Sequence, residues 1–324
     1  MPSPPEAGRL APVLAALLLL AACQATSGAE STPSVRAREF AFTDRSGEQL
    51  DFGQLEFRTG FVLASSDPRF GGLSGLWVAQ GGERLIAASD RGTLWLAEPE
   101  HAADGTLIGL ASWQAIEPGT APGDPPERDA EALAVTGDDL VIAYEGAHRV
   151  RRVPLDGPAS PAAALPTPAA LGEPHNVGIE ALVALEDGAL LAIAEGVRTP
   201  TGDLAAWLIE GDQIASLAYV PAAGFAPTGA DRLDDKIYVL ERRVSLGGLS
   251  ARVVMLDAAD VRPGARLVGR ELGILGPPAL SENFEGIAAR RAPDGGVLLH
   301  LLSDDNFIAL LRSVLLQFAV RAPS

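Results

Sequence analysis

Acidic and hydroxyl side chains recur at matching places in five segments of this sequence. Each segment contains two short apolar runs separated by a polar or glycine-containing turn. The first runs begin at Ser74, Glu131, Glu180, Thr228 and Glu285. The second runs end at Asp90, Glu145, Glu195, Glu241 and Asp304. If the five segments fold alike, up to eight carboxylates come together.

Carboxylates at such a density restrict the chemistry of a site. They repel one another, so they must be protonated, paired with bases or bridged by a cation. Hard oxygen ligands favour Ca²⁺ or Mg²⁺ over Zn²⁺. The expected metal ligands are Glu131, Glu180, Glu285, Asp90, Glu145, Glu195, Glu241 and Asp304.

Two arginines, Arg91 and Arg242, each directly follow an acid of this set. A guanidinium beside a bound metal suits an anionic oxygen such as that of a phosphate or carboxylate. The residues expected to be catalytic are therefore Glu180, Glu285, Arg91 and Arg242. The alternative is that the acids hydrogen-bond turn amides, pair with arginine and hold neighbouring strands in register.

The elements that must position these residues are short β-hairpins. The five segments recur about every 50 residues, and each reads as strand, turn and a more apolar strand. Hairpins repeated at this period are typical of β-propeller blades with four strands each. The sequence therefore predicts an all-β propeller with five blades, alternatively six if residues 36–66 and 154–174 contain further strands.

Hairpin geometry places the candidate residues at one end of the ring. The first strand of a hairpin starts where the second strand ends, so the two sets of acids open on the same face. If the first strands line the central channel, the acids gather at its mouth. The strand predicted at 54–66 can pair with the one at 313–320, which closes the ring and leaves no free sheet edge there.

The N-terminal residues are typical of a targeting segment. Leu10 to Ala22 form an apolar run, interrupted only by Pro12, that is too short to span a bilayer as a helix. It ends in Leu20-Ala21-Ala22-Cys23, which is similar to a bacterial lipobox, and Cys23 is the single cysteine of the chain. We expect a lipoprotein signal peptide at 1–22, lipidation of Cys23, a flexible tether at 23–35 and the propeller at 36–324. The expected location is the bacterial cell envelope, facing the periplasm or the outside.

Composition excludes several classes of partner. The 324 residues include 42 acidic and 25 basic side chains, for a formal net charge of -17. Such a surface repels a phosphate backbone and an anionic membrane. We therefore expect no nucleic-acid partner, membrane contact only through the lipid anchor, and a monomer. The G-x-S-x-G elbow, the H-E-x-x-H motif and the P-loop are absent from the sequence.

Six motifs resemble those of the phytase-like proteins described as having "esterase-like activity of phytase". They are Ser89-Asp90-Arg91-Gly92, Asp129-Ala130-Glu131-Ala132-Leu133, Gly178-Ile179-Glu180-Ala181-Leu182, Leu240-Glu241-Arg242-Arg243, Asn283-Phe284-Glu285-Gly286-Ile287 and Ser303-Asp304-Asp305-Asn306-Phe307. The resemblance covers about residues 55–320. It implies a secreted or periplasmic propeller and, through a more distant likeness to alkaline propeller phytases, Ca²⁺-dependent hydrolysis of phosphate esters.

These observations support three hypotheses. The first is an envelope-anchored hydrolase that acts on a small anionic phosphate or carboxylic ester at a Ca²⁺-bound channel mouth. The second is a non-catalytic binding or scaffolding propeller whose acids are structural. The third is a metal-dependent lactonase, which would resemble the gluconolactonase group. A fold of this kind hosts all three, so the sequence leaves open whether the chain is an enzyme.

Overall fold

The structure is a computed structural model that describes residues 35–40, 50–120, 129–146, 148–172 and 178–322. The described residues lie in one compact unit, Thr32–Ser324. The predicted signal peptide, Cys23 and most of the predicted tether lie outside the described residues. Among the described residues, no helix is long and apolar enough to cross a membrane.

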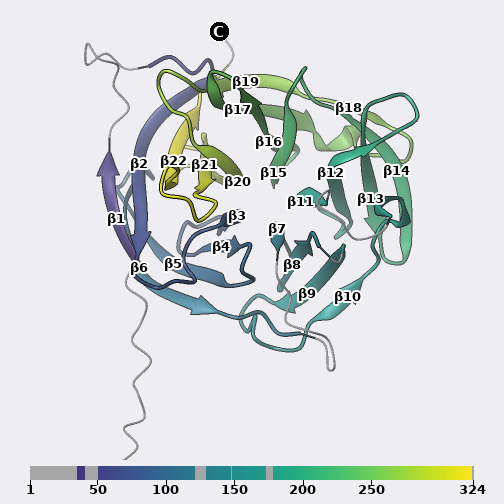
Figure 1. The fold of residues 1–324 in the computed structure, drawn as a ribbon, viewed down its shortest axis with the longest axis horizontal. Coiled ribbons are helices and arrows are strands. Elements are labelled where there is room, and N and C mark those ends of the chain that lie inside the picture. Colours follow the sequence, from purple (N-terminus) through teal and green to yellow (C-terminus); the bar gives the residue numbers. More distant parts are fainter. Residues whose placement is uncertain (1–34, 41–49, 121–128, 147, 173–177, 323–324) are drawn as a thin grey trace, which may run out of the picture. The chain divides into compact units, whose positions relative to one another are not determined.

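Five sheets, antiparallel except for one short parallel strand in blade 3, surround a central axis and form the five blades of a propeller (Figure 1). Blade 1 consists of β3 (Leu73–Val78), β4 (Leu85–Ser89), β5 (Leu94–His101) and β6 (Leu107–Ile116). Blade 2 consists of β7 (Ala130–Thr136), β8 (Asp139–Tyr144), β9 (Arg149–Pro154) and β10 (Ala163–Leu165). Blade 3 consists of β11 (Ile179–Ala184), β12 (Leu190–Arg198), β13 (Leu204–Glu210), β14 (Gln213–Val220) and β18 (Arg266–Val268). Blade 4 consists of β15 (Ala226–Leu233), β16 (Lys236–Ser245), β17 (Gly248–Asp257) and β19 (Arg270–Leu275). Blade 5 consists of β20 (Asn283–Arg291), β21 (Val297–Asp304), β22 (Ser313–Val320), β2 (Leu55–Ser65) and β1 (Val35–Phe40).

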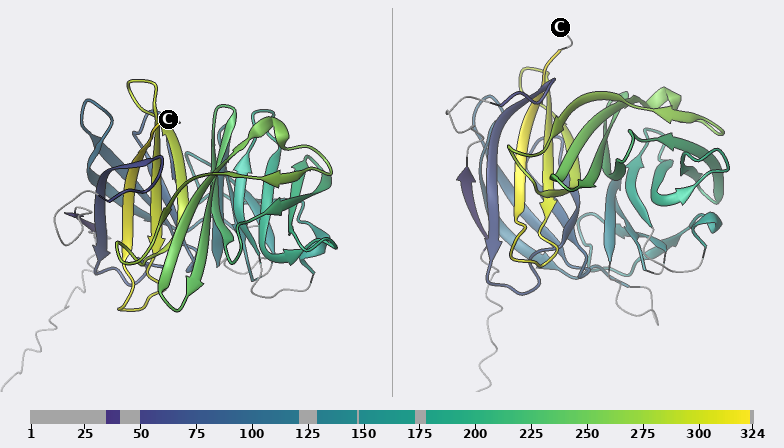
Figure 2. Two further views of the ribbon diagram at one scale, coloured as in Figure 1. Left: turned by 90° about the horizontal axis from the view of Figure 1, so that it is seen from above. Right: turned by 45° about the horizontal axis from the view of Figure 1, so that its top comes forward.

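The strand at the start of each segment is the innermost strand of its blade. Strands β3, β7, β11, β15 and β20 contact one another in ring order. The strands run roughly along the ring axis, so the loops between them gather at its two ends (Figure 2). This arrangement confirms the predicted five-blade architecture, and the six-blade alternative is not observed.

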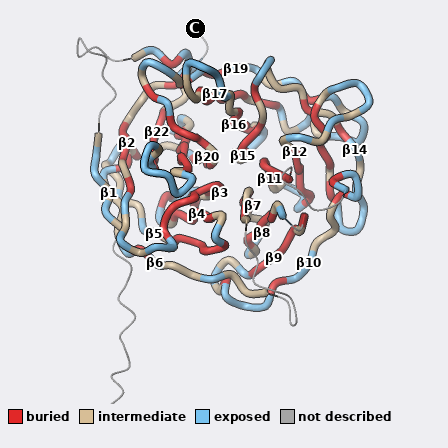
Figure 3. The backbone as a smooth tube through the Cα atoms, in the orientation of Figure 1, coloured by how far each residue is buried: buried red, intermediate tan, exposed pale blue. Residues whose placement is uncertain are grey.

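The core consists of five apolar clusters, one between each pair of neighbouring blades. The middle strands are buried on both faces, as Figure 3 shows by their colour. This explains why second strands such as Leu190–Arg198 begin as continuous apolar runs. Trp95, Tyr219 and Phe318 are among the largest side chains that are fully buried in these clusters.

The N-terminal strand β2 closes the ring, as the sequence predicts. It pairs antiparallel with β22 from Leu55 opposite Val320 to Leu63 opposite Ser313. Strand β1 then adds to the outer edge of β2 and covers it. The last blade is therefore built from both ends of the described chain.

Two outer connections differ from a simple four-strand repeat. In its described part, the proline-rich stretch after β9 contains the short edge strand β10 and the 3-10 helix η1 (Ala169–Leu171), and an edge position suits a segment rich in proline. After β17 and the 3-10 helix η2 (Ala258–Asp260), the chain adds β18 in parallel to β14 of blade 3 before it returns to blade 4 as β19. This exchange links blades 3 and 4 through backbone hydrogen bonds.

Candidate functional site

Each innermost strand contains a β-bulge near its start. In blade 2, Ala130 pairs with Tyr144 and Ala132 pairs with Ala143, which leaves Glu131 as the additional residue. The pairing shifts at the corresponding place in the other four blades. The residues at these bulges are Ser74, Glu131, Glu180, Thr228 and Glu285. These are the five residues predicted to start the first strands, and a bulge is a common device for re-aiming a side chain beside a site.

Small residues follow the bulges because neighbouring blades approach closely there. A Cβ added to Gly75 would lie 2.8 Å from the side chain of Leu133 in blade 2. A Cβ on Gly286 would lie 2.7 Å from the side chain of Leu76 in blade 1. Close approach of the inner strands therefore leaves no room for a side chain at these glycines, whereas the bulges of blades 2 and 3 are followed by alanine.

The five bulge residues fall into two groups, two hydroxyl residues and three glutamates. The Ser74 hydroxyl donates to the carbonyl oxygen of Ala130 in the next blade. The Thr228 hydroxyl donates to the carbonyl oxygen of Phe284 in blade 5 at 3.0 Å. In both cases the acceptor directly precedes an acidic bulge residue. The two hydroxyls therefore link adjacent blades, whereas the three glutamates supply carboxylates to the mouth of the channel.

The second strands add four acids and one arginine to this mouth. Strand pairing makes Ser89, Tyr144, Ala194, Glu241 and Ser303 equivalent, so the next residues are equivalent too. Those next residues are Asp90, Glu145, Glu195, Arg242 and Asp304. Blade 4 thus supplies Arg242 where the other blades supply a carboxylate.

Glu241 is therefore not brought to the mouth with the other predicted ligands. It is fully buried, accepts a hydrogen bond from the Tyr219 hydroxyl at 2.6 Å and forms an ion pair with Arg252 at 2.6 Å. Successive side chains of a strand point to opposite faces, so Glu241 and Arg242 cannot both point to the mouth. In this structure Glu241 is a structural residue between blades 3 and 4.

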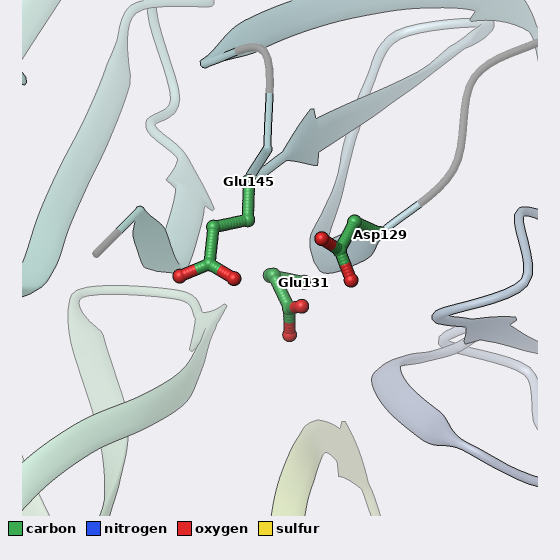
Figure 4. Close-up of side chains that lie close together, drawn as sticks. All are labelled: Asp129, Glu131 and Glu145. Carbon is green, nitrogen blue, oxygen red and sulfur yellow. The ribbon is translucent and has the colours of Figure 1, made fainter. Parts of the chain in front are cut away.

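Three carboxylates of blade 2 lie close together at the mouth. Ligand oxygens of Asp129, Glu131 and Glu145 all lie within 4.8 Å of one another. Figure 4 shows the three side chains pointing toward a common space. Asp129 was not among the predicted ligands, although it belongs to the Asp-Ala-Glu motif noted in the sequence. It has a φ of 65°, a left-handed conformation that aspartate tolerates.

Backbone hydrogen bonds fix this cluster to blade 1. The Asp129 amide donates to the Asp90 carbonyl at 2.7 Å, and the Glu145 amide donates to the Asp129 carbonyl at 2.8 Å. The Asp90 amide in turn donates to the carbonyl of Gly72 at 2.9 Å. The chain of bonds holds the acids in place without using their carboxylates.

The opposite side of the mouth is neutralised by Arg242. Its guanidinium donates to Glu285 at 2.5 Å, to Glu195 at 3.1 Å and to the Asn283 amide oxygen at 2.7 Å. The Asn283 amide nitrogen donates to Glu285 at 2.9 Å and to Asp304 at 3.4 Å. Glu195, Glu285 and Asp304 thus belong to one hydrogen-bonded network around a single cation.

Burial dominates the pKa values of three further acids of the mouth. Burial, followed by the charges of Glu180 and Asp90, raises the pKa of Glu131 to about 11. Burial and the charge of Glu195 raise the pKa of Glu180 well above its usual value. Burial, with Asp304 and Glu285, raises the pKa of Asp90 to about 8. In the absence of a cation, these carboxyl groups retain protons at neutral pH.

Near Arg242 and Asn283, burial raises the pKa values of the acids less, because these two side chains stabilise the charged carboxylates. Burial raises the pKa of Glu285 to about 7, and Arg242 opposes this increase. Burial raises the pKa of Asp304 to about 6, and the backbone amide of Asn306 opposes it. Arg242 thus offsets burial most directly at Glu285, and at Glu180 it is only the last of several effects.

The blade 2 side of the mouth has the donor atoms to hold a hard metal ion. Its donors are carboxylate oxygens only, as Ca²⁺ prefers. Glu180, at 8% exposed, adds a carboxylate from blade 3 that makes no hydrogen bond to the described residues. Buried carboxylates need a compensating charge or hydrogen bonds, so this set of donors has the chemistry that a bound cation requires.

A small cavity lies between the innermost strands, next to two of these acids. It has a volume of about 10 Å³ and is lined by Glu131, Glu285 and the apolar side chains of Leu76, Leu133 and Ile287, among others. Such a cavity holds about one water molecule.

Arg91, the other predicted catalytic arginine, lies at the rim beside Asp90. It is exposed, its guanidinium stacks 3.6 Å from the centre of the Phe307 ring, and it donates to the carbonyl of Pro68. Unlike Arg242, it forms no ion pair with the described residues. It is therefore the cation at this rim that a ligand can approach.

Comparison with known proteins assigns the family. The family model "Phytase-like: Esterase-like activity of phytase" matches residues 68–307, about three quarters of the chain. The chain belongs to this family, as the motifs around the acids predict. Among curated proteins, no sequence similar to the chain was found.

Several solved structures are similar at low identity. The endo-arabinase of Bacteroides thetaiotaomicron VPI-5482 matches with a TM-score of 0.47 and 12% identity over 85% of this chain and 99% of that one. Myxococcus xanthus glutaminyl cyclase matches with a TM-score of 0.41 and 12% identity over 90% of this chain and 99% of that one. A chain of a nidogen/laminin complex matches with a TM-score of 0.41 and 11% identity over 72% of this chain and 82% of that one. None of these similarities transfers an activity or a site to this chain.

Proposed function

We propose that this protein is a metal-dependent hydrolase of phosphate or carboxylic esters, with Ca²⁺ held on the blade 2 side of the channel mouth. The observation that carries the proposal is the group of three carboxylates within 4.8 Å, joined by the buried and unpaired Glu180. Membership of the phytase-like family supports an enzyme of this kind. The proposed ligands are Asp129, Glu131, Glu145 and Glu180, with Asp90 adjacent.

A bound Ca²⁺ would supply Lewis-acid polarisation of the substrate oxygen and a more acidic water. The chain's own residues would orient the substrate. Arg91 is exposed at the rim and would bind an anionic oxygen of the substrate. Arg242 is held by Glu195 and Glu285 and would present its fixed charge from the opposite side. In this arrangement Glu285 is a positioning residue, whereas Glu180 binds the metal directly.

The test compares Glu180→Gln with Glu285→Gln on aryl esters, phosphomonoesters and lactones, with and without Ca²⁺. Loss of one contact in a preorganised site commonly costs about 2.7 to 4 kcal/mol, so hydrolysis should fall about 10²- to 10³-fold in both. High Ca²⁺ should restore part of the activity of Glu180→Gln, because its defect is weaker metal binding. It should not restore Glu285→Gln, whose defect is the position of Arg242.

The exposed carboxylate Glu210, at the end of β13, provides a matched control, and Glu210→Gln should keep full activity. Folded protein that hydrolyses none of these substrates at any Ca²⁺ concentration would support a binding or scaffolding propeller instead. Hydrolysis confined to lactones would support the lactonase hypothesis.

We also propose that Cys23 is lipidated and anchors a monomeric propeller to the cell envelope, facing the periplasm or the outside. The support is the lipobox-like sequence directly before this single cysteine. The net charge of -17 supports the anchor as the only membrane contact and argues against a nucleic-acid partner.

A further inference from the structure

The loop between β21 and β22, residues 305–312, forms a lip at the mouth. Figure 1 shows this loop curling beside β3 near the centre of the ring, and Figure 3 shows that much of it is exposed. A Cβ on Gly72 would overlap the Phe307 ring and lie 2.9 Å from the Asp90 carboxylate. The lip loop therefore adjoins the acids of blade 1.

The lip loop is rigidly built around one carboxylate. Asp305 accepts hydrogen bonds from the amides of Gly72 and Phe307, each at 3.0 Å, and from the hydroxyl of Ser313 at 3.2 Å. Asp304 accepts a further bond from the Asn306 amide at 2.6 Å. The loop is thus tied to blade 1, to β22 and to itself.

These bonds hold the backbone in an uncommon conformation. Asn306 and Phe307 have φ values of 48° and 52° in succession. For a bulky residue such as phenylalanine this left-handed conformation is rare and persists only where its surroundings enforce it. Backbone strain of this kind is frequent at functional sites.

The same loop exposes apolar side chains at the rim. Leu310 is 92% exposed, Ile308 is 50% exposed and Phe307 is 38% exposed. Three adjoining apolar residues beside an acid-rich mouth are unusual on a surface with a net charge of -17. Stacked on Phe307 is the exposed Arg91 guanidinium. The lip thus combines an apolar surface with one accessible cation.

We propose that the lip loop binds the apolar group of an ester substrate, with the alkyl or aryl part against Ile308 and Leu310 and the anionic head beside Arg91. This inference rests on the proposed function, because it uses the neighbouring acids as the reaction site. The expected substrates are amphiphilic esters with a single anionic or ester head group, rather than densely charged polyphosphates. The position of Phe307 beside Asp90 makes the apolar surface continuous with the mouth.

The test measures binding rather than turnover. Isothermal titration calorimetry with methylphosphonate and octylphosphonate, in Ca²⁺ and with full-length Cys23→Ala protein, isolates the contribution of the alkyl chain. A fully buried CH₂ is worth about fourfold in affinity and a half-buried one about twofold. Octylphosphonate should therefore bind at least about tenfold more tightly than methylphosphonate.

Substitution of the lip provides the second arm. Ile308→Ser combined with Leu310→Ser should abolish the octyl advantage and leave the affinity for methylphosphonate unchanged. Ile108, 58% exposed on β6 of blade 1, is the matched control, and Ile108→Ser should change neither affinity. Equal affinities of the two phosphonates in the parent protein, or an octyl advantage that survives the double substitution, would overturn the proposal.

The outcomes separate this inference from the proposed hydrolase. A lip-dependent octyl advantage without hydrolysis of any ester would support binding of amphiphiles at the lip, but it would remove the hydrolase and with it the assignment of the ligand as a substrate. Hydrolysis with no preference for apolar groups would support the hydrolase and contradict the lip inference. If the double substitution instead weakens binding to zwitterionic phosphatidylcholine vesicles and leaves octylphosphonate binding intact, the lip is a membrane contact and the inference is wrong.

Discussion

Replacing Glu131 with glutamine should make the metal-free protein more stable at neutral pH. In the folded state burial and neighbouring charges raise the pKa of Glu131 to about 11, whereas the ordinary value is 4.5. The folded protein therefore retains a proton that the unfolded chain releases above pH 4.5. Folding stability from this group is fully present below pH 4.5 and decreases as the pH rises toward the folded value.

The magnitude follows from the pH interval. Each pH unit between the unfolded pKa of 4.5 and the working pH costs about 1.36 kcal/mol, which gives about 3 kcal/mol at pH 7 and under about 1 kcal/mol at pH 5. Glutamine is neutral at every pH and avoids this cost. For a domain of this size, the gain at pH 7 corresponds to a rise of roughly 5 to 10 °C in melting temperature.

The assay is thermal unfolding monitored by circular dichroism, in chelator and in millimolar Ca²⁺, at pH 5 and pH 7. In chelator at pH 7, Glu131→Gln should melt above the parent, and the difference should shrink at pH 5. Calcium at a hundredfold excess over its dissociation constant should stabilise the parent by about 2.7 kcal/mol and Glu131→Gln by much less. Glu210→Gln should behave as the parent throughout.

One result would refute the reasoning. If Glu131→Gln melts at or below the parent temperature in chelator at pH 7, the glutamate is not the electrostatically costly group inferred here. A gain of equal size at pH 5 and pH 7 would assign the effect to packing rather than to the proton.

Three further predictions follow from other parts of the molecule. Glu241→Gln should destabilise the protein by about 3 kcal/mol equally in Ca²⁺ and in chelator, measured by urea unfolding, because it breaks the buried pair with Arg252 and not a metal site. Gly229→Ala should cost about 1 to 3 kcal/mol in the same assay, since the new Cβ would overlap the carbonyl of Glu285, whereas Gly247→Ala should cost well under that; equal effects would contradict the close-approach argument. Cys23→Ala should move the protein from the membrane fraction to the soluble fraction, and undiminished membrane association would contradict a lipid anchor.

The propeller and most of its mouth could be predicted because the repeat has a fixed hairpin geometry. The spacing of Glu131, Glu180 and Glu285 identified three equivalent bulge positions, and the strand at 54–66 closes the ring as expected. These features depend on the period of the repeat and on the alternation of apolar residues, which the sequence displays directly.

The register of blade 4 could not be predicted in the same way. The sequence Leu240-Glu241-Arg242-Arg243 offers an acid and a base at adjacent places, and a shift of one residue exchanges the faces on which they lie. The bulge at Thr228 sets the register by pairing Pro227 with Glu241, so that Arg242 faces the mouth. No local pattern in the sequence specifies where that bulge falls.

Asp129 was missed for a different reason. It precedes its strand, so it has no equivalent in the alignment of strand starts. Its position depends on hydrogen bonds with Asp90 and Glu145, which come from two different blades. The signal available in the sequence was the acid two residues before Glu131, a spacing that places both side chains near one strand end.

The pairing of β2 with β22 has a consequence for how the chain folds during synthesis. Leu55 must remain without its partner until Val320 has been made, so blade 5 is the last blade that can be completed. Until then β2 and β20 belong to incomplete sheets with open edges, which are the sites where chains pair wrongly and aggregate. Contacts this distant in sequence also form slowly. Ring closure thus makes completion of the fold depend on the synthesis of β22. A chain that stops before Ser313 should therefore fail to form the whole propeller rather than lose a single strand.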